Sequence, residues 1–218
     1  MQFYVYIVYT WMYAMSTSKR KSYHHGDLHD ALIDLAVKAL DKGGPESLTL
    51  RGLAERAGVS GMAPYRHFAD KAALLAATAR RGFAELRERL LRVDDPEDPS
   101  KSLVAFGVVY VRFACERPGL FRLMFGGAPP TDDDELTDDP RTVFGLIATR
   151  LADLTPPKRR RIAFVAAWSA IHGLASLMVS GRLRGPTPDA AKLAEDVGAI
   201  VVAGLLAGPA PYKARAAR

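Results

Sequence analysis

Apolar residues at helical spacing run through almost the whole chain, and this periodicity limits the fold more than any other feature. In residues 28–39, for example, apolar side chains recur every three or four positions, which is the spacing of one face of an α-helix. After the first fourteen residues, no segment alternates polar and apolar positions convincingly, as a half-buried strand does. We therefore expect an all-α protein.

Capping residues and helix breakers divide this pattern into separate helices. Asp27 lies where an N-cap is expected, and Gly43-Gly44-Pro45 ends the first helix. Asp70 is placed to cap a later, long helix. Further helices are expected at residues 103–116, 118–125, 140–154, 157–182 and 187–207. With 218 residues, the chain is long enough for one or two domains with a sizeable core.

The net charge of +6 is divided unevenly along the chain. Residues 16–92 carry 14 Lys/Arg and 9 Asp/Glu, residues 93–157 carry 6 and 12, and residues 158–218 carry 10 and 3. A basic first part beside an acidic middle part indicates an anionic partner such as nucleic acid. The single cysteine, Cys115, excludes an internal disulfide and a zinc site built on cysteines.

Two short helices joined by a tight turn form the feature with the clearest functional meaning. The first is expected at residues 50–57 with Thr49 as its N-cap, and the second at residues 61–67 with Ser60 as its N-cap. Gly58 supplies the turn between them. In a helix-turn-helix, the first helix crosses the DNA backbone and the second enters the major groove. We therefore predict a DNA-binding segment whose recognition helix spans residues 61–67.

The same segment resembles the DNA-binding part of TetR-type transcriptional regulators. The resemblance covers about residues 27–92 and rests on Gly58-Val59-Ser60, Tyr65-Arg66-His67-Phe68, Lys71 and Leu74-Leu75. A shorter resemblance lies near the C-terminus, where Trp168, His172 and Gly173 are similar to the Trp…His-Gly (WHG) signature of one C-terminal class. The resemblance implies a homodimeric, all-helical repressor that binds double-stranded DNA at a palindromic operator and is released by a small-molecule effector.

The resemblance also implies how the chain is divided. An N-terminal three-helix helix-turn-helix domain, at residues 27–71, is followed by a larger helical ligand-binding and dimerisation domain, at residues 72–208. Before them, residues 1–15 are expected to be an upstream extension or disordered, and residues 16–26 to be a basic arm. Residues 209–218 are expected to form a basic tail.

Residue by residue, the resemblance implies which side chains contact DNA. Phosphate contacts are expected from Thr49, Ser60, Tyr65, His67 and Lys71. Met62 and Ala63 lie where base contacts are expected, but their side chains can only touch thymine methyl groups. Gly61 lies in the same helix, and Pro64 departs from the commonest family pattern. Both residues are expected to weaken the recognition helix.

Sequence readout is therefore expected to depend on Arg66, on DNA shape and on the basic arm. The arm residues Lys19, Arg20 and Lys21 precede the first helix. They either enter the minor groove or form a solvated tail, and the sequence favours neither alternative.

Aromatic residues of the second half are the candidates for an effector pocket. Trp168 and His172 are four residues apart and therefore share one helix face. The full candidate set, expected in the core first and in a pocket wall second, is Phe106, Tyr110, Phe113, Phe121, Met124, Trp168 and His172. Such walls indicate a small apolar or aromatic effector. We expect no catalytic residue, metal or cofactor, because the sequence offers no nucleophile or convergent titratable set.

The helices expected at residues 157–182 and 187–207 are apolar nearly all round. A monomer would expose one face of each, whereas pairing with the same helices of a second copy gives a four-helix dimer interface. The alternative is a membrane-anchored helical sensor or small-molecule-binding protein, anchored by residues 1–14 or 162–179. Residues 1–14 are too few to span a bilayer as a helix, and residues 162–179 include polar and small residues. We therefore expect a cytoplasmic protein.

Overall fold

The computed structural model describes residues 25–44, 48–126, 142–183 and 189–208, and these residues form helices without any strand. The expected all-α fold is therefore confirmed. Some predictions concern segments outside the described residues, namely the extension at 1–15, the arm residues Lys19, Arg20 and Lys21, and the tail at 209–218. These stay predictions.

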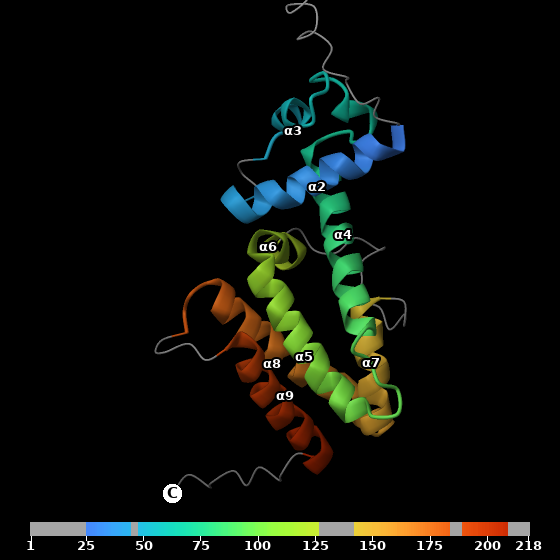
Figure 1. Ribbon diagram of the computed structural model, residues 1–218. Coiled ribbons are helices and arrows are strands. Elements are labelled where there is room, and N and C mark those ends of the chain that lie inside the picture. The colour runs from blue at the N-terminus through green and yellow to red at the C-terminus, as the bar shows by residue number, and fades with distance from the viewer. Residues whose placement is uncertain (1–24, 45–47, 127–141, 184–188, 209–218) are drawn as a thin grey trace, which may run out of the picture.

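The helices follow one another closely along the chain (Figure 1). In order they are α2 (His25–Gly43), α3 (Leu50–Arg56), the 3-10 helix η2 (Pro64–Arg66), α4 (Lys71–Leu91), α5 (Pro99–Glu116), α6 (Pro118–Gly126), α7 (Val143–Leu154), the 3-10 helix η3 (Pro157–Arg159), α8 (Arg160–Val179) and α9 (Ala190–Ala207). The side chains of Thr49 and Asp70 each accept a hydrogen bond from a backbone N–H three residues on, at 3.0 and 2.8 Å. These two predicted N-caps are thus confirmed. The N-cap predicted at Asp27 is wrong, because α2 begins at His25, inside the segment predicted as the basic arm.

The segment predicted as the recognition helix, residues 61–67, differs from expectation. Only η2 forms there, and residues 61–63 form turns. Pro64 has no N–H with which to bond the carbonyl of Ser60, and that carbonyl accepts instead from Ala63 N at 2.9 Å. The N-cap of η2 is Ala63, without a side-chain cap, so the expected capping role of Ser60 is wrong.

Two hydrophobic cores lie along helix α4. The first contains Leu32 of α2, Leu53 of α3 and Leu74 of α4. The second contains Leu86 of α4 and Phe113 of α5, together with residues of α6, α7, α8 and α9. Figure 1 shows α2 and α3 at one end of the molecule, α5, α7, α8 and α9 at the other, and α4 running between them. Helix α4 therefore contributes buried side chains to both cores.

A second connection joins the two parts where α2 ends against the start of α6. The carboxylate Oδ1 of Asp41 accepts hydrogen bonds from Gly119 N at 3.0 Å and Leu120 N at 3.4 Å. These amides belong to the first turn of α6, which has no intrahelical partners for them. A Cβ on Gly119 would collide with the backbone carbonyl of Leu40, so α2 and α6 approach each other at backbone distance. We call Leu40, Asp41, Gly119 and Leu120 the α2–α6 junction.

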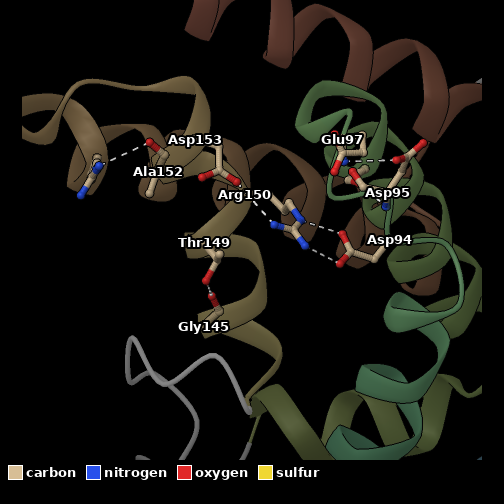
Figure 2. Close-up of polar contacts among 10 residues, drawn as sticks. Asp94, Asp95, Glu97, Gly145, Thr149, Arg150, Ala152 and Asp153 are labelled. Atoms are coloured by element: carbon tan, nitrogen blue, oxygen red, sulfur yellow. Dashed lines mark hydrogen bonds and ion pairs between the residues drawn. The ribbon is translucent and has the colours of Figure 1, made fainter.

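An ion pair fastens the α4–α5 loop to α7 (Figure 2). Arg150 donates from Nε to Asp94 Oδ1 at 2.8 Å and from Nη2 to Asp94 Oδ2 at 2.7 Å. The two side chains are only 13% and 9% exposed. The hydrogen bonds from Arg150 hold the pKa of Asp94 below its ordinary value. This bidentate geometry ties the C-terminal end of α4 to α7.

Candidate nucleic-acid interface and effector pocket

The turn after α3 is fixed by its backbone. Gly58 has a φ of +69°, a conformation that a residue with a side chain adopts only with strain. Gly58 N donates to Glu55 O at 3.0 Å, and Val59 N donates to Ala54 O at 3.0 Å. Val59 then packs against the first core, which sets the direction of the chain after the turn.

The residues after this turn present an exposed edge. Buried Pro64 and Phe68 hold the segment against the first core. Its exposed members are Ser60, Gly61, Met62, Tyr65 and Arg66, which we call the recognition edge. Met62 is 65% exposed and Tyr65 is 42% exposed. Large apolar side chains held outward next to a cation suit contact with a partner surface.

The other predicted DNA-binding residues differ in how far they are exposed. Thr49 is exposed, but its hydroxyl oxygen already caps α3. Ala63 and Lys71 are half-buried. His67 is also half-buried, and its Nε2 is buried without a hydrogen-bond partner among the described residues. A contact from His67 to a phosphate would therefore use Nδ1. These DNA contacts stay predictions.

Arg51 lies beside the recognition edge and was missed by the sequence analysis. It is exposed on α3, and a Cβ on Gly61 would lie 3.9 Å from its Cγ. A signal was available, because the first helix of a helix-turn-helix faces the DNA backbone and Arg51 lies in the first turn of that helix. Arg51 therefore adds an exposed cation beside Gly61 of the recognition edge.

A partly open apolar cavity of about 50 Å³ lies between α5, α7, α8 and α9. Three of the predicted pocket residues line it, namely Phe106, Tyr110 and Trp168. The sequence analysis missed the rest of the wall, which consists of Leu103, Gly107, Ile147, Ala167, Ile171, Gly198, Val201, Val202 and Leu205. The wall residues of α9 could not be predicted, because the sequence of a helix that is apolar all round does not show which neighbouring helix each side chain faces.

The remaining predicted pocket residues, Phe113, Phe121, Met124 and His172, do not line this cavity and instead pack in the core beside it. His172 is the centre of an aromatic cluster there, with ring centroids 5.5 Å from Phe121, 5.0 Å from Phe125 and 5.4 Å from Trp168. Phe121 and Phe125 belong to α6, so this cluster connects the cavity wall to the α2–α6 junction.

The polar side-chain atoms of this cluster lie close to one another. Tyr110 Oη and His172 Nδ1 are hydrogen-bonded at 2.8 Å. Burial lowers the pKa of His172 and raises the pKa of Tyr110, so both side chains are uncharged at neutral pH, and the tautomer of the imidazole sets which of the two donates. The indole N–H of Trp168 lies near enough to the Tyr110 hydroxyl to oppose that rise in pKa. The indole nitrogen is buried and has no hydrogen-bond partner among the described residues.

The fold and these sites first define a class: an all-helical protein with a helix-turn-helix on one domain and an apolar cavity in a second, joined by a shared helix. Comparison with known families then identifies it. Residues 32–78 match the family model for bacterial regulatory proteins of the tetR family, and residues 103–199 match a tetracyclin repressor-like C-terminal domain. The chain therefore belongs to the tetR family of bacterial regulatory proteins. The WHG class of its C-terminal domain stays a prediction.

Individual relatives are distant. A nucleoid occlusion factor, SlmA of Vibrio vulnificus (strain YJ016), is 29% identical over 119 residues, which are 54% of this chain and 61% of SlmA. The match thus spans less than two thirds of that relative. An uncharacterized HTH-type transcriptional regulator of Mycobacterium tuberculosis, Rv1255c, is 26% identical over 172 residues, covering 78% of this chain and 84% of its own.

Two solved structures resemble the whole arrangement. A protein of unknown function from Rhodococcus sp. RHA1 has a TM-score of 0.72 at 28% identity, over 86% of this chain and all of its own. A variant of TetR from Acinetobacter baumannii AYE, in complex with minocycline, has a TM-score of 0.56 at 27% identity, over 82% of this chain and 93% of its own.

Proposed function

We propose that the protein is a transcriptional repressor that binds a palindromic operator as a homodimer and leaves it when a small apolar or aromatic effector binds. The observation that carries the proposal is the recognition edge, in which the buried Pro64 and Phe68 hold the exposed Tyr65 and Arg66 outward, while the exposed Arg51 lies beside Gly61 of the same edge. Phosphate contacts from such cations position a protein on DNA, while Met62 and Arg66 face the bases. Neither a catalytic role nor a metal is part of the proposal.

The dimer is supported by the apolar side chains that α8 and α9 leave uncovered. Ile162 and Ile200 are 64% and 72% exposed, and Val165, Leu177 and Leu206 are exposed as well. Residues 157–179 are also long and apolar enough to cross a membrane, and only 17% of their most apolar window is buried within one chain. A second copy covers such a face without lipid and places two recognition edges on one duplex, as a palindrome requires. The protein is then cytoplasmic.

Fluorescence anisotropy of the purified full chain tests this function. The probe is a duplex from the region upstream of the protein's own gene, titrated at several salt concentrations beside a scrambled duplex of the same composition. We expect nanomolar binding to the upstream duplex alone, with a steep decrease in affinity as salt rises. Absence of binding to both duplexes at low salt would contradict the DNA-binding proposal.

Fractionation tests the competing membrane anchor. The full chain and a chain starting at Met15 are expressed, lysed and centrifuged. We expect both in the supernatant. Pelleting of both chains would assign α8 to the membrane, and pelleting of the longer chain alone would assign the anchor to the first fourteen residues; either outcome contradicts the cytoplasmic repressor.

A further inference from the structure

Met62 is an apolar side chain left in solvent at the centre of the recognition edge. Within residues 28–44 and 48–70, only two large apolar side chains are exposed, Met62 at 65% and Tyr65 at 42%. Tyr65 has a hydroxyl that can bond a phosphate, whereas Met62 has only a thioether sulfur, which is a weak acceptor. The apolar face of α8 and α9 does not include Met62, so the dimer gives no reason for its exposure.

The backbone holds Met62 at the surface in a closed turn. Ala63 N donates to Ser60 O at 2.9 Å, and Gly61 and Met62 form the turn between them. The buried Pro64 follows directly and fastens the turn to the first core. On the other side, Gly61 has no side chain that could cover Met62. Met62 is therefore presented by a fixed part of the molecule.

The polar side chains around Met62 leave it a distinct role. Ser60, Tyr65 and Arg66 are exposed, and no hydrogen bond or ion pair with another described residue occupies their side chains. These groups, with the exposed Arg51, can bond phosphates and the polar edges of bases. Met62 can only add an apolar contact, because it has no donor and no strong acceptor.

In the major groove, the C5-methyl group of thymine is the apolar group that a base pair presents. 5-Methylcytosine carries a methyl group on the same carbon, whereas uracil and cytosine carry hydrogen there. A hydrogen-bonding side chain would distinguish the O4 acceptor of thymine from the N4 donor of cytosine. An apolar contact from Met62 depends on the methyl group and not on which pyrimidine carries it.

We propose that Met62 recognises the C5-methyl group of a pyrimidine in the operator. The protein then accepts thymine or 5-methylcytosine at that position and binds uracil or unmethylated cytosine more weakly. The inference rests on the proposed function, because it places the recognition edge in the major groove. It goes further in one respect, since methylation of a cytosine at that position strengthens operator binding. Loss of one methyl contact weakens binding about fourfold, and loss in both half-sites weakens it at least about tenfold.

A comparison of duplexes tests the methyl contact. Selection from a random duplex library with the purified full chain gives an operator sequence, and each thymine is then replaced with uracil in both half-sites, which removes only the methyl group. Where uracil weakens binding, four duplexes are compared by fluorescence anisotropy: thymine and uracil opposite adenine, and 5-methylcytosine and cytosine opposite guanine.

We expect the methyl group to strengthen binding at least about tenfold in both comparisons. The partner purine is the same within each comparison, so contacts of Arg66 with that purine cancel. An operator in which no thymine can be distinguished from uracil would overturn the proposal. A methyl effect opposite adenine but not opposite guanine would overturn it as well.

Three variants assign the methyl effect to a residue. Met62→Leu keeps an apolar end, Met62→Gln keeps the length but ends in an amide, and Tyr65→Ala removes a predicted phosphate contact from the same edge. We expect Met62→Leu to keep the methyl effect and Met62→Gln to reduce it below about twofold. Tyr65→Ala should weaken binding of all four duplexes by one factor and keep the methyl effect. A full methyl effect in Met62→Gln would overturn the proposal.

The outcomes separate this inference from the proposed function. Because Met62 is exposed, its variants should keep the Tm of the wild-type protein, so a lost methyl effect does not report unfolding. Selection of a specific duplex whose affinity depends on neither the C5-methyl groups nor Met62 overturns the inference and leaves the repressor proposal standing. Failure to select any specific duplex overturns both.

Discussion

At the scale of single residues, solvent exposure distinguishes side chains that can bind a partner from side chains of the core, even within one short segment. Tyr65 is 42% exposed and Phe68 is 3% exposed, although both belong to the same short segment. We expect Tyr65→Ala to lower DNA affinity at least about tenfold with little change in stability. Phe68→Ala is expected to lower the free energy of unfolding by about 3–5 kcal/mol.

Anisotropy with the upstream duplex and urea denaturation measure these two effects. If Tyr65→Ala lost as much stability as Phe68→Ala, Tyr65 would be a core residue and the recognition edge would need another definition.

His172 makes stability depend on pH. Burial holds its pKa below the ordinary histidine value of about 6.5, so the unfolded chain binds a proton at this residue more readily than the folded chain does. The contribution is fully present above that ordinary value and is lost as pH falls through it toward the lowered pKa. We expect the free energy of unfolding to decrease between about pH 7.5 and about pH 5.5, and to decrease less in His172→Gln.

Urea denaturation at the two pH values gives this difference. An identical decrease in the wild-type protein and in His172→Gln would assign the pH dependence to other residues.

At the scale of elements, the two glycines of the helix-turn-helix have opposite roles. Gly58 has a φ of +69°, whereas Gly61 does not have a positive φ, and a Cβ there would make only an ordinary contact with Arg51. We expect Gly58→Ala to destabilise the protein by about 1–2 kcal/mol through backbone strain. Gly61→Ala should stabilise it by about 0.4–1 kcal/mol, because the unfolded chain loses freedom. Thermal unfolding of the two variants measures both changes. If both variants were destabilised, or both stabilised, the opposite roles of the two glycines would be contradicted.

The ion pair between the α4–α5 loop and α7 is expected to matter because both partners are largely buried. Asp94→Ala leaves Arg150 as a buried charge without its main partner and should cost about 3 kcal/mol of unfolding free energy. The double variant Asp94→Ala with Arg150→Met removes that charge and should recover part of the loss. A double variant less stable than Asp94→Ala would show that Arg150 stabilises the protein through other contacts, such as Asp153.

Sequence predicted the start of two helices from local capping interactions. Thr49 and Asp70 cap helices at the expected positions, since an N-cap depends on residues three positions away. The recognition segment was predicted as a helix at residues 61–67 weakened by Gly61 and Pro64, and only the 3-10 helix Pro64–Arg66 forms there, because Pro64 lacks the N–H that an α-helix needs. The cavity wall was predicted only in part, because Val201 and Leu205 depend on which helix α9 packs against, which is not a local property.

At the scale of the whole molecule, the exposed apolar face of α8 and α9 predicts a dimer. We expect sedimentation equilibrium to give a mass near twice 23.7 kDa at micromolar concentration. Ile200→Glu places a charge at the most exposed apolar position of this face and should raise the dimer Kd at least about a hundredfold. Ala84→Glu, on α4, should leave the dimer intact. A monomeric wild-type protein would remove the argument for a palindromic operator.

The α2–α6 junction determines how chimeric regulators could be made from this chain. Exchanging α2 together with the helix-turn-helix, in order to redirect the protein to another operator, would keep Gly119 but replace Asp41, and would leave the first amides of α6 without their acceptor. Exchanging the C-terminal part would place a side chain from another regulator against the carbonyl of Leu40 unless it too has glycine there. A functional graft therefore has to transfer Asp41 and Gly119 as a matched pair, although 78 positions separate them along the chain.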